Sequence, residues 1–126
     1  MCASWSVPVQ HHALVSVATE CGQDIAALLA EMQDESELFA SPNTLAAVEQ
    51  ALLTMAHTLA QLGPPLRDHL TELDWAGWQA LHAALLRRVT PRRELVWYGV
   101  QALVPATMGL LQRLWQRHPA LLLTQP

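Results

Sequence analysis

In the first half of the chain, apolar residues recur with the spacing of an α-helix. Between residues 9 and 32 they share one helix face (Leu14, Val17, Ala18, Cys21, Ile25, Leu28, Leu29, Met32). The acidic run DESE at residues 34–37 is expected to end this helix. Ser41 as N-cap and Pro42 in the first turn then predict a second helix, which Gly63 and the two following prolines stop. Its apolar face contains Leu45, Val48, Leu52, Met55, Ala56 and Leu59.

The second half shows the same pattern with clearer boundaries. A short helical segment at residues 66–73 leads to Asp74, a good N-cap for a helix over residues 75–89. Thr90 and Pro91 break the chain and open the last helix, residues 92–116. Pro105 lies inside that helix and is expected to kink or divide it, because proline lacks the backbone N–H donor. The dipeptide HP at residues 118–119 closes it.

No stretch alternates between apolar and polar residues for long enough to predict a sheet, so the fold class is all-α. Four principal helices with short connections predict an up-and-down four-helix bundle with one short extra helix. The length of 126 residues corresponds to one domain, residues 1–126.

The composition of the chain also predicts where the protein is found in the cell. Apolar residues make up 52% of the chain and charged residues only 14%, which argues against disorder. Polar residues interrupt every apolar stretch well before the ~20 residues that a membrane-spanning helix needs. The first residues lack the basic region of a secretory signal, and Cys2 and Cys21 fit no metal or redox spacing. We therefore expect a cytoplasmic protein with free thiols and no membrane segment.

Charge is unevenly distributed along the chain. Residues 1–62 contain seven acids and no arginine or lysine, whereas residues 63–126 contain all seven arginines and four acids. Four arginines fall within seven positions: Arg87, Arg88, Arg92 and Arg93. One interpretation is a solvated helix end, where cations interact favourably with the helix dipole. The other is a phosphate-binding patch, because guanidinium groups match phosphate geometry.

Several kinds of site are disfavoured by spacing. His11 and His12 are adjacent and point away from each other on a helix, and His57 has no histidine or acidic partner one turn away. No HExxH or CxxC motif occurs, so we expect no metal site and no cofactor. No serine lies in a nucleophile elbow. The tryptophans are expected to be core or interface residues rather than platforms for base stacking.

The order of landmarks over roughly residues 11–117 resembles the HepT-like branch of the HEPN superfamily. The segments LFASPNTLAAVEQALLTMAHTLAQLGPPLRDHLTELDW and VWYGVQALVP carry the resemblance. In that branch a helix pair ends in a Pro/Glu-rich turn and a tryptophan, matched here by Trp75. The motif Arg-Asn-x-x-x-His-x-Tyr follows, then a tryptophan matched by Trp97, and a proline eight residues later, matched by Pro105.

The resemblance implies an all-helical homodimer encoded beside a minimal nucleotidyltransferase that acts as its antitoxin. The HEPN protein of such a pair is a metal-independent ribonuclease toxin, silenced when the nucleotidyltransferase attaches AMP to the motif's tyrosine. Arginine and histidine of both protomers meet in a cleft at the dimer axis. Such residues suit RNA cleavage, since histidine can activate the ribose 2′-hydroxyl and arginine can stabilise charge on the phosphate.

The chain departs from the family at this motif. The family's arginine falls on His82, seven residues after Trp75, and its asparagine falls on Ala83. Its histidine falls on Arg87 and its modified tyrosine on Val89. One histidine and one arginine are kept five residues apart in reversed order, so His82 and Arg87 are the candidate catalytic residues. Tyr98 lies beyond the motif and does not inherit the tyrosine's role.

Three explanations of the altered motif remain open. In the first, the site is inactive and its residues have drifted. In the second, the exchanged pair still works, because a two-fold axis brings both residue types together. In the third, the cleft binds nucleotide or RNA phosphate without cleavage, through Arg87, Arg88, Arg92 and Arg93. The function hypotheses follow from these. One is a ribonuclease toxin, and the alternative is an inactive homodimer that binds a nucleotide or a nucleotidyltransferase partner. A third is a helical bundle that matches the landmarks by chance.

Overall fold

The computed structural model describes residues 7–87 and 92–123, with side chains left undescribed at positions 7–10, 92, 121 and 123. Every regular element in these ranges is helical, and no strand occurs in them, so the fold is all-α as predicted. The helices are α1 (Val7–Leu29), α2 (Glu35–Phe39), α3 (Pro42–Ala60), α4 (Pro64–Arg67), α5 (Trp75–Arg87) and α6 (Arg92–Tyr98). The π-helix η2 (Gly99–Leu103), α7 (Val104–Arg117) and α8 (Pro119–Leu123) complete the chain.

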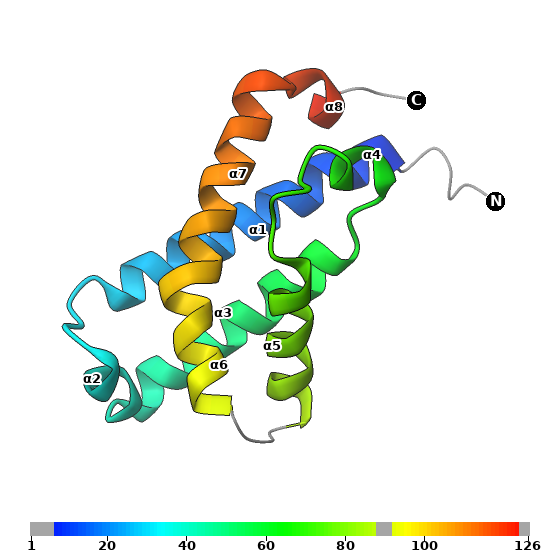
Figure 1. Cartoon of the computed structure of the whole chain (residues 1–126). Coiled ribbons are helices and arrows are strands. Elements are labelled where there is room, and N and C mark those ends of the chain that lie inside the picture. The colour runs from blue at the N-terminus through cyan, green and yellow to red at the C-terminus, as the bar shows by residue number, and fades with distance from the viewer. Residues whose placement is uncertain (1–6, 88–91, 124–126) are drawn as a thin grey trace.

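The helices form two antiparallel pairs (Figure 1). α1 packs mainly on α3, and α5 runs beside α6 in the opposite direction. The first pair lies across the second, with α3 contacting α5 and α1 contacting α7 and α8 (Figure 1). The interior is built chiefly of leucine, and its fully buried side chains include Ile25, Leu52, Met55, Leu81, Leu103 and Leu111.

Local capping signals position α5. The Asp74 Oδ1 atom accepts a hydrogen bond from the Gly77 N–H at 2.9 Å, which is the N-cap interaction that the sequence predicted. Ser41 holds the corresponding place before α3, but its hydroxyl donates to the Glu37 carbonyl at 2.9 Å and makes no side-chain cap. Thr90 and Pro91, the predicted start of the next helix, lie outside the described residues.

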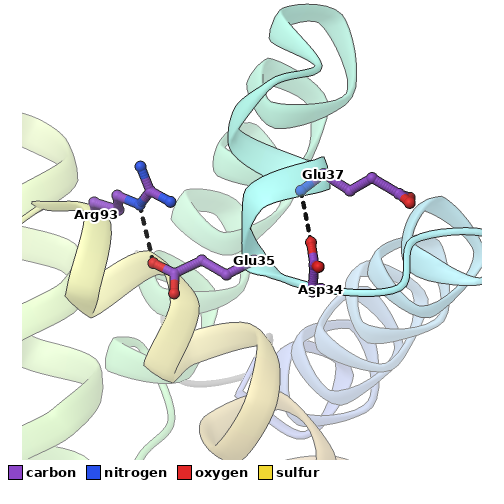
Figure 2. Close-up of polar contacts among 4 residues, drawn as sticks. All are labelled: Asp34, Glu35, Glu37 and Arg93. Carbon is purple, nitrogen blue, oxygen red and sulfur yellow. Dashed lines mark hydrogen bonds and ion pairs between the residues drawn. The ribbon is translucent and has the colours of Figure 1, made fainter.

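Two features differ from the sequence-based expectation. The DESE run was expected only to end the first helix, which in fact ends at Leu29; it instead opens α2. Asp34 caps α2 by accepting from the Glu37 N–H at 2.9 Å, and Leu38 anchors it in the core (Figure 2). The interruption at Pro105 takes the form of η2. Here the Val104 N–H donates to the Gly99 carbonyl five residues back, which widens the helix just before a residue that cannot donate.

Candidate functional site

His82 projects from the middle of α5 and is half-buried. It borders a cavity of about 30 Å³, which is also lined by Ala56, Leu59, Ala60, Arg67, Trp75, Trp78 and Gln79. The imidazole of His57, on α3, lies beside it, with ring centroids 6.1 Å apart and ring planes tilted by 48°. The sequence predicted no partner for His57, because the pairing of His57 with His82 depends on how α3 and α5 pack.

Arg67 is the cationic side chain on the wall of this cavity. Its guanidinium carbon lies 4.1 Å from the centre of the Trp75 ring, and its Nε atom donates to the Leu62 carbonyl at 3.1 Å. Trp75 is fixed in turn, because its Nε1 atom donates to the Leu70 carbonyl at 3.1 Å. The contact with the Trp75 ring and the hydrogen bond to Leu62 hold Arg67 in the wall of the cavity. The cavity wall therefore contains one imidazole, His82, and one guanidinium, Arg67, and the imidazole of His57 lies beside His82.

Arg87 lies in the last turn of α5 and does not converge on His82. At 3.6 residues per turn, five residues advance a helix by one turn and about 140° more, so the two side chains leave different sides of α5. Arg87 is exposed, and the preceding Leu86 has 62% of its surface exposed. The two predicted catalytic residues therefore do not form a site within one chain.

The remaining predicted phosphate-binding arginines have different surroundings. Arg88 lies outside the described residues, and Arg92 begins α6 with its side chain undescribed. Arg93 donates from Nε to a Glu35 carboxylate oxygen at 2.9 Å, and its guanidinium carbon lies 4.5 Å from the centre of the Phe39 ring (Figure 2). Arg93 therefore joins α6 to α2, and a phosphate would compete with a carboxylate for it.

Asp74 and Tyr98 form a polar contact between the start of α5 and the end of α6. The Tyr98 hydroxyl donates to Asp74 Oδ2 at 2.6 Å, while Asp74 Oδ1 keeps its capping bond to Gly77. The hydrogen bond from Tyr98, followed by that from Gly77, lowers the pKa of Asp74. The hydrogen bond to Asp74 raises the pKa of Tyr98, with smaller contributions from desolvation and the carboxylate charge. This contact contributes fully to stability between about pH 4 and about pH 10, the ordinary pKa values of the two groups. The contribution is lost as the pH falls through the lowered pKa of Asp74 or rises through the raised pKa of Tyr98.

Because Tyr98 is the only tyrosine, its ionisation can be read directly from ultraviolet absorbance. We expect Asp74→Asn to lower the pKa of Tyr98, since asparagine keeps the helix cap but replaces the charged acceptor of the Tyr98 hydrogen bond with a weaker, neutral one. Alkaline titration of the wild type and the variant measures the change. Asp68→Asn, which removes an exposed carboxylate six residues earlier in the sequence, is the control and should titrate like the wild type. Superimposable curves for Asp74→Asn and Asp68→Asn would contradict the assignment.

The largest hollows lie away from these residues. One of about 540 Å³ lies between α1 and α3 and is lined by three alanines, Leu28, Cys21, Asp24, Gln50 and Thr54. Another, of about 630 Å³, lies between α1 and α7 and is lined by three glutamines, Pro105, Met108 and Trp115 among others. Neither contains a predicted site residue. No set of three or more His, Cys, Asp or Glu side chains within 7–87 and 92–123 is arranged to hold a metal ion.

Comparisons with known proteins identify no relative: no family model, no curated protein and no solved structure matches the chain. The likeness to HEPN proteins thus remains a prediction from the order and spacing of the sequence landmarks. A search of the described helices finds none with the length and hydropathy to cross a membrane.

Proposed function

We propose that this chain is a HepT-like HEPN protein of a toxin–antitoxin pair, a four-helix bundle that dimerises and cuts RNA without a metal ion. In this proposal one protomer supplies His82 and the other supplies Arg87 to a shared cleft, and a minimal nucleotidyltransferase is the antitoxin. The observation that carries the proposal is that the side chains of His82 and Arg87 leave different sides of α5. They can therefore act together only if a second copy of the chain completes the site.

The chemistry requires one proton acceptor, one proton donor and a cation. His82 takes the proton of the ribose 2′-hydroxyl, and the 2′-oxygen attacks phosphorus. Arg87 of the second copy stabilises the charge on the phosphate oxygens. The 5′-oxygen leaves with a proton. In this proposal His57 donates that proton, because its ring lies beside that of His82, with 6.1 Å between the ring centroids. The products are a 2′,3′-cyclic phosphate and a 5′-hydroxyl. Arg88 and Arg92 extend the RNA-binding surface, and Arg93 joins it if RNA displaces Glu35.

Complementation between two inactive variants tests whether the site is shared. We expect His82→Ala and Arg87→Ala each to lower the cleavage rate of total tRNA in metal-free buffer by about 100-fold or more. When equal amounts are mixed and subunits exchange, half of the dimers are mixed, and each mixed dimer has one complete site of two. About one quarter of wild-type activity should therefore return.

Light scattering and circular dichroism establish that each variant is a folded dimer before the activities are compared. Mixing two portions of the same variant is the matched control and should restore nothing. Cleavage by the wild type without any recovery on mixing would overturn the shared site. Retained cleavage in both single variants would remove His82 and Arg87 from the mechanism.

The alternative is an inactive HEPN homodimer that binds a nucleotide or holds the nucleotidyltransferase. The ion pair between Arg93 and Glu35 favours the partner-holding form of this alternative, because one of the predicted phosphate ligands is already paired with a carboxylate. This alternative predicts a folded dimer that cleaves no tRNA. It also predicts stable co-purification when the chain is produced with a small nucleotidyltransferase encoded beside it.

A further inference from the structure

A second cluster of basic side chains lies where α7 ends. His69, from the connection between α4 and α5, and His118, at the end of α7, have ring centroids 4.3 Å apart and ring planes tilted by 45°. They line a hollow of about 100 Å³ with Glu72, Arg113 and Arg117, above the leucines of α7. In Figure 1 this end of α7 lies at the opposite end of the molecule from the C-terminal end of α5, whose last residue is Arg87. The cluster is therefore separate from the proposed cleavage site.

The surrounding structure fixes the backbone that carries these exposed side chains. Arg113 and Arg117 are one turn apart on α7 and share a face, while Leu110 and Leu114 anchor that part of the helix in the core. The His118 N–H donates to the Leu114 carbonyl at 2.8 Å, which fixes the end of the helix. On the other side, Leu70 follows His69 and is buried. The two elements that carry the cluster are thus each anchored next to it.

The charge around the hollow is strongly one-sided. Four basic side chains face one acid, Glu72, and the sequence contains no aspartate or glutamate after Glu94. Within the described part of the chain, no carboxylate forms an ion pair with Arg113 or Arg117, in contrast to Arg93. Interaction with the helix dipole accounts for cations in the last turn of α7, but Arg113 lies a turn earlier and His69 comes from another element.

This combination suits a small dianion. Guanidinium groups form paired, charge-assisted hydrogen bonds with phosphate oxygens, and imidazoles add further donors. Two imidazoles in contact repel each other when both are protonated, and a bound dianion offsets that repulsion. The volume is well below the roughly 300 Å³ or more of pockets for drug-sized ligands. We propose that His69, Arg113, Arg117 and His118 bind a single phosphate group, either free inorganic phosphate or the terminal phosphate of an RNA.

Histidine proton resonances locate the binding site in the full-length protein. Inorganic phosphate is titrated at constant ionic strength, and the ring resonances are assigned with His69→Gln and His118→Gln. We expect the resonances of His69 and His118 to move together and to saturate with one dissociation constant, while those of His57 and His82 stay in place. The double variant Arg113→Gln/Arg117→Gln should bind phosphate about tenfold more weakly or worse. The double variant Gln33→Glu/Gln101→Glu changes the net charge by the same two units at exposed positions outside the hollow, and it should leave this dissociation constant unchanged.

Two short RNAs of one sequence separate the sources of the phosphate. Movement of the His69 and His118 resonances with the 5′-phosphorylated RNA but not with the 5′-hydroxyl RNA identifies an RNA end as ligand. Saturation with inorganic phosphate alone identifies the free anion. The proposal is overturned if neither phosphate nor the phosphorylated RNA gives a saturable shift. It is also overturned if the arginine double variant binds as tightly as the wild type. Neither result bears on cleavage at His82 and Arg87.

Discussion

Trp78→Ala is expected to lower the free energy of unfolding by about 3–5 kcal/mol, because it empties a large buried site between α5 and α7. Only 3% of the Trp78 surface is exposed. Its Nε1 atom donates to the Thr107 hydroxyl at 2.9 Å in the interior. Truncation therefore also leaves the buried hydroxyl oxygen of Thr107 without this hydrogen bond. Urea denaturation followed by circular dichroism measures the change.

Trp115→Ala provides the matched comparison. Trp115 is only partly buried and meets the exposed His12 edge-on at 5.4 Å between centroids, so its loss should cost clearly less. A double-mutant cycle with Trp78→Phe and Thr107→Val isolates the hydrogen bond, for which we expect a coupling of about 0.5–1.5 kcal/mol. Equal destabilisation by Trp78→Ala and Trp115→Ala would show that Trp78 does not join α5 to α7 as described.

Gly99→Val is expected to destabilise the fold by about 2–3 kcal/mol through overpacking. Gly99 begins η2 and is buried, and a Cβ atom there would lie 2.8 Å from Leu81 Cδ2 and 3.5 Å from Leu52 Cδ2. Both leucines are fully buried, so neither can move aside without disturbing the core. Thermal and urea unfolding of the variant measure the loss.

Gly109→Val is the control for the backbone effect of the same substitution. Gly109 lies in α7, and a Cβ atom there would have no heavy atom within 4 Å apart from its chain neighbours and the backbone of its own helix. Valine in a helix is slightly more favourable than glycine, so this variant should be neutral or a few tenths of a kcal/mol more stable. Similar costs at Gly99 and Gly109 would mean that the close approach of η2 to α3 and α5 does not limit residue size.

The sequence predicted that the last helix would be interrupted near Pro105, but it did not predict a π-helix there. The close packing of Gly99 against neighbouring helices explains the difference. Proline at this position removes a donor whatever the fold, which is a local effect. The π-helical path from Gly99 to Leu103 additionally places Gly99 against Leu52 and Leu81, which belong to two other helices. That contact depends on three elements packing together, and the pattern along one element does not contain it.

The short helix α2 shows the same limit. A helix of five residues is too short to display a helical period, and the acidic run DESE was expected only to end the preceding helix. Its anchors are tertiary: Leu38 enters the core, and Arg93 of α6 reaches both Glu35 and Phe39. The arginine group near residue 90 was predicted as a unit, yet the fold directs Arg93 to a carboxylate and leaves Arg87 exposed.

The sequence by itself determined the all-α class, the order of the main helices and the cap at Asp74. These features follow from residue period, proline and capping side chains, which act over a few neighbouring residues. Only the tertiary structure decided that His82 lies beside His57 rather than Arg87, and that His69 meets His118. The reason is physical: helix period fixes the direction of a side chain on its own helix, whereas its partner depends on how separate helices pack.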